Sequence, residues 1–492
     1  MAFRRRQGVA PRGTRGESIE TTTSRGRLRS RMELLPLTLL GQAESGLAGS
    51  AGEFFSFAST HWRFCLLHFL EFAVWGAWFV VLGNLLNARG FSRSEIGWIY
   101  STMPIGSMIA PLFMAVLADR YFNTEVLIGV SHLFGGVLLF LMARTQRPWP
   151  FFWLTLAYAI LFSPTLNLVN SIVFAHDADI FAGKAQEGFP WIRVFGTLGW
   201  IVAGLSHTLI IKKGEPLNER PLLLAAGLSL LLGSFAFTLP ATLPAGAEPA
   251  AEATAEAGSE AGIETSPAAD VADATEDAEP AVGRSILAGS LEMLTRNPVF
   301  FGVTFVAAMA MGLYFAFAAL FVEKSGITPR TVGPVMTIGQ WIEIFFMLSL
   351  PWFLGPGNKN MNYVLMAGIT AWALRFAFFA VGRPLALILL GVAIHGICFD
   401  FFFAAGFINA DRISPDGLTA TAQQLYGFLV YGLGMFLGSL GAGWLNQTFT
   451  TVATDAEGRE VATTRWSLFW AVPAVIVGVS AALFWFSVMG GR

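Results

Sequence analysis

The stretch WRFCLLHFLEFAVWGAWFVVLGNLLN at residues 62–87 decides the fold, because it is an almost unbroken run of apolar side chains. A helix needs roughly 20 such residues to cross the hydrocarbon core of a bilayer. Similar runs recur along the chain, and their continuity excludes the alternating pattern of a transmembrane β-barrel. One carboxylate, Glu71, lies inside this first stretch. A charge at membrane depth costs several kcal/mol unless a partner or a wet cavity receives it.

The composition of the whole chain agrees with a membrane protein. Its 492 residues are 54% hydrophobic and 13% charged, and they include 45 Phe. The mean hydropathy is +0.59. We therefore predict an all-α membrane protein with twelve transmembrane helices. The predicted spans lie near 62–87, 95–118, 124–143, 149–174, 190–211, 221–240, 298–322, 331–353, 361–381, 384–407, 418–446 and 465–489.

The predicted spans divide into two sets of six, separated by a polar linker. Residues 1–60 form a basic tail that we expect to be disordered, and residues 61–240 form an N-terminal six-helix bundle. Residues 241–297 form an acidic linker, in which Glu recurs at every fourth position and weakens any helix by like-charge repulsion. The linker ends in an amphipathic segment, Arg284–Arg296, predicted to lie on the membrane surface. Residues 298–492 form the C-terminal six-helix bundle.

Two features of the chain place both termini on the cytoplasmic side. An even number of spans brings the termini to the same face, and the nine Arg between Arg4 and Arg31, with Arg63, favour the cytoplasm. The tail lacks the short apolar core of a signal peptide. The short loops do not follow the positive-inside rule, so the orientation rests on the first helix.

The sequence carries no pattern typical of a membrane enzyme. Such enzymes usually show a metal or nucleophile motif, H-E-x-x-H or G-x-S-x-G, and neither is present. The two cysteines, Cys65 and Cys398, lie in predicted spans and have no metal-ligand spacing. We expect no catalytic residues, no metal ion, no cofactor and no nucleic-acid partner. The expected surroundings are the lipid bilayer.

Three predicted spans carry charged residues that we interpret as functional. Arg193 and Thr197 share a helical face, as do Gln340 and Glu343, and Asp400 lies in the tenth span. Arginine keeps its charge and therefore needs an anion inside a bundle. Arg193 and Asp400 fall at similar depth in opposite halves, which makes them a candidate ion pair across the pathway. Glu343 and Glu71 fall nearer the midplane, where transporter sites usually lie.

The remaining polar residues in the spans allow two interpretations. His68, Glu71 and Trp75 share one face, and Glu71 is either a carboxylate that holds helices together or an acid that lines the cavity, which we favour. Asn167 and Asn170 also share a face, and their amides suit interhelical contacts and substrate contacts equally.

Two further spans carry polar side chains that we interpret as structural. Arg375 is expected to form an ion pair or to extend to the interface, and His395, five residues before Asp400, is expected to be structural.

Several stretches of the chain are similar to one known family of transporters. The most specific are FPWIRVFGTLGW (189–200), GQWIEIFF (339–346), AWALRFAFFAVG (371–382) and HGICFDFFF (395–403). They resemble the nucleoside:proton symporter family of the major facilitator superfamily, from about Trp62 to the last span. The resemblance implies the major facilitator fold, with two six-helix bundles around a central pathway.

The resemblance also implies a function and a set of site residues. It implies a monomeric, proton-coupled symporter that imports nucleosides across the cytoplasmic (inner) membrane by alternating access. By matching motifs, the substrate site consists of Arg193, Thr197, Gln340, Glu343, Phe399 and Asp400, to which we add Glu71 and Asn167 from the reading of the spans. Asp400 and Glu343 are the expected proton-coupling residues.

The sequence departs from the family pattern at two places. The seventh span has Ala316 and Ala319 where substrate-binding amides are expected, and the first span has Glu71 where Gln is expected. These departures leave open a related carrier of a sugar or another nucleoside-like metabolite. A polytopic membrane enzyme is a more distant alternative.

Overall fold

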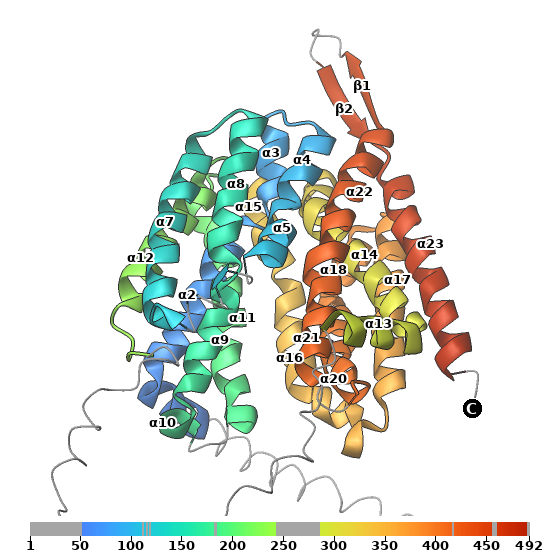
Figure 1. Ribbon diagram of the computed structural model, residues 1–492. Coiled ribbons are helices and arrows are strands. Elements are labelled where there is room, and N and C mark those ends of the chain that lie inside the picture. Colours follow the sequence, from blue (N-terminus) through green and yellow to red (C-terminus); the bar gives the residue numbers. More distant parts are fainter. Residues whose placement is uncertain are drawn as a thin grey trace, which may run out of the picture. The chain divides into compact units, whose positions relative to one another are not determined.

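The computed structural model describes residues 52–110, 113–114, 117, 120–181, 185–242, 286–415, 418–454 and 460–489 (Figure 1). Most of the predicted basic tail and the whole acidic stretch from Pro244 to Val282 lie outside the described residues. Residues 52–60 are helical, so the prediction of disorder is wrong for that segment, which carries three Phe and no Arg. The membrane-embedded unit begins at His61.

The N-terminal half of this unit consists of helices joined by short connections. They are α2 (Trp62–Trp78), α3 (Leu82–Ala88), α4 (Arg93–Tyr100), α5 (Thr102–Ile109), α7 (Thr124–Arg144), α8 (Pro148–Phe162), α9 (Thr165–Ala175), α10 (Asp177–Phe181), α11 (Ala185–Ile210) and α12 (Arg220–Ala236).

The C-terminal half follows the linker. Its helices are α13 (Ile286–Arg296), α14 (Pro298–Lys324), α15 (Pro329–Met336), α16 (Ile338–Leu354), α17 (Met361–Val381), α18 (Leu385–Ala393), α19 (His395–Cys398), α20 (Ala405–Arg412), α21 (Thr419–Gly427), α22 (Met435–Thr448) and α23 (Trp466–Phe484). Short 3₁₀ and π segments are η1 (Pro356–Asn358), η2 (Phe399–Ala404), η3 (Phe428–Gly434) and η4 (Trp485–Met489).

The described helices support an all-α membrane protein. Nine continuous helical stretches, several of which join two of these helices, are long and apolar enough to cross a bilayer within the described residues. There are ten if Leu385–Ala393 and His395–Arg412, which are bent by 41° relative to each other, count as one span. The other two predicted spans, near 95–118 and 221–240, correspond to α4 with α5 and to the 17-residue α12. The first of these includes residues that are not described.

Several predicted spans are broken into two helices at places the sequence explains. Helix α8 ends just before Pro164, because the proline ring fixes φ and proline lacks the N–H that would continue the helix. The tenth and eleventh spans contain the π segments η2 and η3, which are frequent at functional sites. The predicted interfacial segment forms α13, whose Met293 is buried.

The two halves contact each other closely at one end, drawn at the top in Figure 1. Asn84 of α3 donates hydrogen bonds to the Ala319 carbonyl oxygen (3.2 Å) and to Glu323 Oε2 (2.6 Å) of α14. Arg330 of α15 donates to the Thr208 carbonyl oxygen at 2.7 Å. A Cβ on Gly97 of α4 would lie 2.7 Å from the Ser439 carbonyl oxygen of α22, so glycine is required for this approach.

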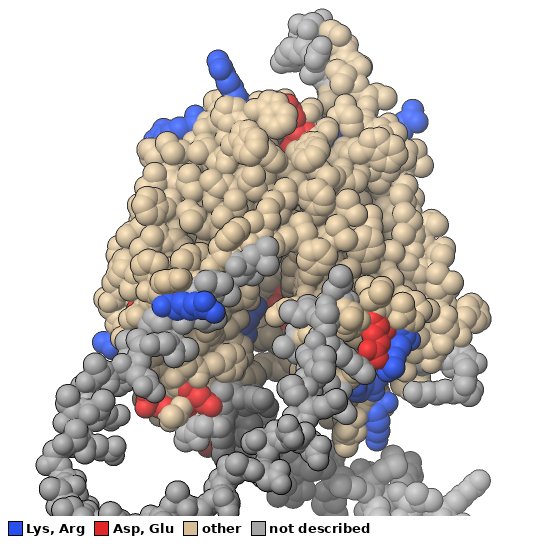
Figure 2. All heavy atoms as spheres, viewed as in Figure 1, with Lys and Arg blue, Asp and Glu red and all other residues tan. Residues whose placement is uncertain are grey.

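The same end carries a hairpin that the sequence analysis did not predict. Strands β1 (Thr450–Thr454) and β2 (Glu460–Thr464) pair antiparallel, with Thr450 opposite Thr464. Both strands are rich in Thr, Val and Ala, and β-branched residues favour extended backbone. At the opposite edge, Figure 2 shows the surface hollowed between the two halves.

Candidate functional site

Arg193 enters the interior of the protein from α11, in the N-terminal half. Its side chain is half-buried, and its guanidinium lies over the ring of Phe72 at 4.2 Å from the ring centre, a cation–π contact with α2. Thr197, one turn later on the same face, is buried. One guanidinium nitrogen, Nη1, has no hydrogen-bond partner among the described residues. The charge of Arg193 is thus held by an aromatic face instead of a direct anion.

Two glycines bring α16 against α19 in the C-terminal half. A Cβ on Gly396 would lie 2.6 Å from the Glu343 backbone nitrogen, and one on Gly339 would lie 2.6 Å from His395 Cβ. This close packing puts His395 Nε2 at 3.8 Å from Glu343 Oε2. The glycine spacing therefore creates a buried acid–histidine contact, where the sequence analysis expected His395 to be only structural.

Asp400 lies in the π segment η2, directly after α19. The side chain is 1% exposed, and its Oδ2 has no hydrogen-bond partner within the described part of the chain. A π segment shifts the residues that follow it relative to an α-helix and is frequent at functional sites. Here it places a buried carboxylate next to Phe399, which is half-buried and stacks on His395 with ring centres 5.9 Å apart.

We call Arg193, Glu343 and Asp400 the central charged cluster. Both carboxylates lie within electrostatic reach of Arg193, as does the hydroxyl of Tyr431 in η3. The predicted ion pair between Arg193 and Asp400 is not formed in this structure, since no pair within 4.0 Å joins them in the described residues. The cluster thus brings one cation and two acids together from both halves, and within the described residues Arg193 Nη1 and Asp400 Oδ2 have no direct partner.

An aromatic pocket lies between the halves, and Gln340, a predicted site residue, lines it. Its lining residues are Val80, Trp200, Tyr314, Phe315, Met336 and Gln340. The Oε1 atom of Gln340 has no hydrogen-bond partner in the described chain. The pocket combines aromatic faces with an amide oxygen, and in this conformation its free space is about that of one water molecule.

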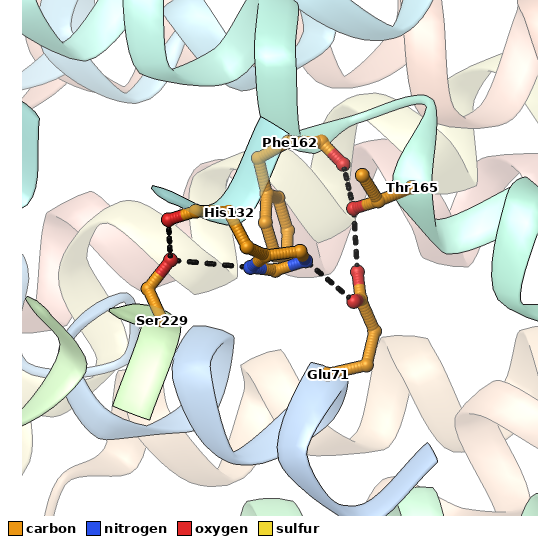
Figure 3. Close-up of polar contacts among 5 residues, drawn as sticks. All are labelled: Glu71, His132, Phe162, Thr165 and Ser229. Atoms are coloured by element: carbon orange, nitrogen blue, oxygen red, sulfur yellow. Dashed lines mark hydrogen bonds and ion pairs between the residues drawn. The ribbon is translucent and has the colours of Figure 1, made fainter. Parts of the chain in front are cut away.

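Glu71 does not line this pocket, which corrects the interpretation favoured from the sequence. The side chain is fully buried, and both carboxylate oxygens are bonded inside the N-terminal half (Figure 3). Oε2 lies 2.8 Å from His132 Nε2, and Oε1 lies 2.7 Å from Thr165 Oγ1. The physical reason is that α7 and α9 supply complete partners, so the carboxylate needs no wet cavity. The other interpretation, a carboxylate that holds helices together, describes this structure.

The two asparagines of α9 have different surroundings. Asn170 is half-buried, and its Oδ1 lies 3.2 Å from His68 Nε2 of α2, so it links two helices. Asn167 is exposed, and no contact joins it to the central charged cluster in the described residues. The structure therefore does not bring Asn167 together with the other predicted substrate-binding residues.

Arg375 corrects the expectation of an ion pair or of a side chain that extends to the interface. It is fully buried on α17, and within the described residues no carboxylate pairs with it. Its Nε donates to the Gly391 carbonyl oxygen at 2.9 Å, and its guanidinium lies 4.3 Å from the ring centre of Tyr314 and 4.8 Å from that of Trp372. Aromatic faces stabilise the charge, and one of them lines the pocket.

The two alanines of the seventh span lie at the contact between the halves. Ala316 and Ala319 of α14 are buried, and the Ala316 carbonyl oxygen would lie 2.6 Å from a Cβ on Gly83 of α3. The Ala319 carbonyl oxygen accepts the hydrogen bond from Asn84. In this conformation, small side chains there permit close helix packing, and neither alanine lines the aromatic pocket.

Sequence reasoning missed several residues that the structure places at the site. Trp200 lies seven residues after Arg193, which places both residues on the same helical face two turns apart. This spacing could have identified Trp200 from the sequence. Tyr431 lies in the most polar predicted span, and its nearness to Arg193 had no local signal. Phe72 adjoins Glu71 but was counted as an ordinary apolar residue.

Comparisons with known proteins agree with this geometry. The family model described as nucleoside H⁺ symporter matches residues 58–263 and 267–489. The putative nucleoside transporter YegT of Escherichia coli (strain K12) is 32% identical over 435 residues, covering 86% of this chain and 92% of that protein. The xanthosine permease of the same organism is 30% identical, covering 86% and 94%.

Solved structures share the fold. The crystal structure of the nucleoside transporter NupG superimposes with a TM-score of 0.68 at 26% identity, covering 86% of this chain and 97% of that chain. A bacterial homologue of the lysosomal transporter Spinster has a TM-score of 0.61 at 13% identity, which indicates the fold alone. A membrane unit with the major facilitator fold, charges split between its halves and a family match over most of its length leads to one conclusion: the chain belongs to the nucleoside H⁺ symporter family of multi-pass membrane transporters.

Proposed function

We propose that this protein imports nucleosides across the cytoplasmic membrane by proton-coupled alternating access. The observation that carries the proposal is the central charged cluster, whose charges come from both halves and form no ion pair with one another in the described residues. A charge at membrane depth is seldom tolerated without a role. The names of relatives, which include a nucleoside transporter and a xanthosine permease, support nucleosides as the substrate class.

In this proposal the aromatic pocket holds the base once a movement of the two halves has widened it, and polar groups near it hold the ribose. Trp200 and Phe315 supply ring faces, and Gln340 supplies an amide. Glu343, Arg193 and Thr197 supply further hydrogen-bonding groups, and Phe399, which stacks on His395, supplies a further aromatic ring. Asn167 and Glu71 have no part in the proposed site.

We propose that Asp400, with Glu343, carries the transported proton. Protonation of Asp400 removes its attraction to Arg193, which biases the equilibrium between the two orientations of the halves. With cytoplasmic termini, the end that carries the hairpin is periplasmic, and contacts such as Asn84 to Glu323 close it. The structure then corresponds to an inward-facing state. Both halves of the pathway belong to one chain, so a monomer is sufficient.

Uptake into proteoliposomes under an imposed proton gradient tests the proposal. Wild-type protein is expected to concentrate radiolabelled uridine and adenosine, and Asp400→Asn is expected to lose concentrative uptake while exchange without a gradient persists. Asp411→Asn is the matched control, because Asp411 is an exposed acid on α20 outside the cluster.

Two results would contradict the proposal. Normal concentrative uptake by Asp400→Asn would remove Asp400 from proton coupling. Competition in which a disaccharide displaces the label and unlabelled nucleosides do not would replace the substrate class with a sugar.

A further inference from the structure

Arg375 is a buried cation that the proposed transport mechanism does not use. It lies on α17, is fully buried, and is not among the residues that line the aromatic pocket. Its Nη1 and Nη2 atoms have no hydrogen-bond partner among the described residues. A charge in the membrane region without a carboxylate partner is costly and seldom tolerated without a role. The groups that the guanidinium does contact therefore indicate what that role is.

The link between α17 and α18 does not explain the charge. Arg375 Nε donates to the Gly391 carbonyl oxygen at 2.9 Å. The amide nitrogen of a glutamine is the same number of bonds from the backbone as the Nε atom of an arginine, and it is also a donor. A neutral glutamine could therefore make this hydrogen bond. The guanidinium group beyond Nε is not needed to join the two helices.

The guanidinium lies over two aromatic rings, and only one of them is anchored by a hydrogen bond of its own. Its carbon is 4.3 Å from the ring centre of Tyr314 and 4.8 Å from that of Trp372. Trp372 Nε1 donates to the Cys398 carbonyl oxygen at 2.9 Å, which fixes that ring independently of Arg375. The Tyr314 hydroxyl makes no such bond within the described chain, and its ring is held by other rings and by the guanidinium.

Tyr314 connects Arg375 to two parts of the proposed substrate site. Its ring lines the aromatic pocket together with Gln340. The same ring stacks on His395, with ring centres 5.7 Å apart and planes 17° apart. His395 Nε2 in turn lies 3.8 Å from Glu343 Oε2. A displacement of the Tyr314 ring would therefore change a wall of the pocket and the histidine beside Glu343.

We propose that Arg375 is a positioning residue of the nucleoside site, whose guanidinium holds the ring of Tyr314 in place as a wall of the aromatic pocket. This inference rests on the proposed function, in which that pocket holds the base. A side chain that is already ordered does not have to be immobilised when the substrate binds, which increases affinity. Arg375, Tyr314 and Trp372 all belong to the C-terminal half, so a rigid movement of the halves keeps their contacts.

Isothermal titration calorimetry with uridine tests the proposal in Arg375→Gln. This variant keeps a donor for Gly391 and removes the guanidinium from the rings. We expect affinity to fall about 2- to 12-fold, the cost of ordering one further side chain on binding. Wild-type protein that binds neither uridine nor adenosine would contradict the proposed function. Wild-type affinity in Arg375→Gln would overturn the role of Arg375 alone, so the two failures are distinguishable.

A double-mutant cycle shows whether Arg375 acts through Tyr314. Tyr314→Leu removes the ring and is expected to weaken uridine binding by itself. In that background, Arg375→Gln is expected to cause no further loss, because the ring that it positions is gone. Additive losses would overturn the proposal. If Arg375→Gln does not fold, Tyr314→Leu still decides, since wild-type affinity in that variant excludes action through the ring.

Arg89 provides the matched control for a purely structural arginine. Its guanidinium also lies near an aromatic ring, 5.8 Å from the ring centre of Phe151, and Nη2 donates to the Ala143 carbonyl oxygen at 2.7 Å. It contacts the end of α7, away from the residues that line the pocket. Arg89→Gln is expected to lower the midpoint of thermal unfolding and to leave uridine affinity unchanged. An equal loss of affinity in Arg89→Gln and Arg375→Gln would overturn the positioning role.

Fluorine NMR gives a measurement that needs no substrate. The chain contains seven Tyr, and in full-length protein labelled with fluorotyrosine the Tyr314 signal is the one that disappears in Tyr314→Phe. We expect one narrow Tyr314 signal in wild type and in Arg89→Gln. In Arg375→Gln the signal is expected to broaden or split, because the ring takes more than one position. A single narrow signal in Arg375→Gln would show that the ring is held without the guanidinium and would overturn the proposal.

Discussion

The central charged cluster differs from a second buried cluster, made of Glu71, His132, Thr165 and Ser229 and called here the four-helix polar cluster. The difference is whether the polar atoms have hydrogen-bond partners. The central cluster holds Arg193 with two carboxylates, whereas the four-helix polar cluster holds one carboxylate, Glu71, with His132. In the central cluster, Arg193 Nη1 and Asp400 Oδ2 lack partners among the residues that the structure describes, whereas in the four-helix polar cluster the ring nitrogens and both carboxylate oxygens are bonded within 3.1 Å. The central cluster is shared between halves that move, and the other lies inside one half.

The two clusters thus differ in the satisfaction of their hydrogen bonds more than in their burial. A carboxylate with complete partners stabilises the helices that supply them, and its removal leaves those partners without a bond. A carboxylate without partners is available to a substrate or a proton. The following predictions test whether the two clusters can be separated in this way, from the largest expected effect to the smallest.

Removal of Glu343 is expected to have the largest effect on binding. A hydrogen bond to a charged group contributes about 1.5–3 kcal/mol, so Glu343→Ala should weaken nucleoside binding about 10- to 150-fold. Isothermal titration calorimetry with uridine measures the change. Glu71→Ala serves as the comparison from the other cluster, and we expect its affinity for uridine to stay within about threefold of wild type, well under 1.4 kcal/mol.

Removal of Glu71 is expected to act on stability instead. In Glu71→Ala, His132 Nε2 loses its partner while the Thr165 hydroxyl keeps the Phe162 carbonyl oxygen as an acceptor, and an unsatisfied buried group costs about 1–3 kcal/mol. Thermal unfolding in detergent should show a lower midpoint for Glu71→Ala than for Glu71→Gln, because the amide retains part of the hydrogen bonding. Equal midpoints for wild type and both variants would show that the cluster does not hold the helices together.

Weakening the contact between the two halves is expected to have a smaller effect. Asn84→Ala removes two hydrogen bonds to α14, a net contribution of roughly 1 kcal/mol each. We expect faster access from the hairpin side of the protein, measured as labelling of a cysteine introduced at Val80, which lines the pocket. Ser206→Ala is the control, since Ser206 bonds only within its own helix. Unchanged labelling in Asn84→Ala would show that other contacts close this end.

The linker is expected to have no effect on either cluster. The stretch from Pro244 to Val282 contains no Lys or Arg and few large apolar residues, so it is unsuited to burying a core. Replacement by a neutral Gly/Ser linker should leave uptake and thermal stability near wild type. Lost uptake with normal membrane insertion would indicate a regulatory role.

Part of the site could be predicted from the sequence, for a definite reason. Arg193, Gln340, Glu343 and Asp400 are polar residues in apolar spans, and the motifs around them resemble the family. The spans themselves follow from hydropathy, since only a helix satisfies its own backbone in lipid. The fold class and the family expected from the sequence are confirmed.

Other assignments depended on contacts between residues far apart in the chain. Glu71 and His132 are 61 positions apart, and local periodicity gives no information about such a pairing. Arg375 was expected to find an anion or the interface, but it stacks on the rings of Tyr314 and Trp372. The hairpin after α22 was missed because its Thr-rich strands are short and lie in a connection between spans.

The sequence by itself therefore determined which segments enter the membrane and which charges they carry there. The reason is that the cost of placing a segment in lipid depends only on the polar and apolar residues of that segment. The tertiary structure alone decided which of those charges are satisfied. That decision depends on close helix packing, such as Gly396 against Glu343, and on partners supplied by other helices. Glu71 and Glu343 look alike in sequence, and only their neighbours distinguish a carboxylate with two short hydrogen bonds from one whose nearest ion-pair partner, His395, is 3.8 Å away.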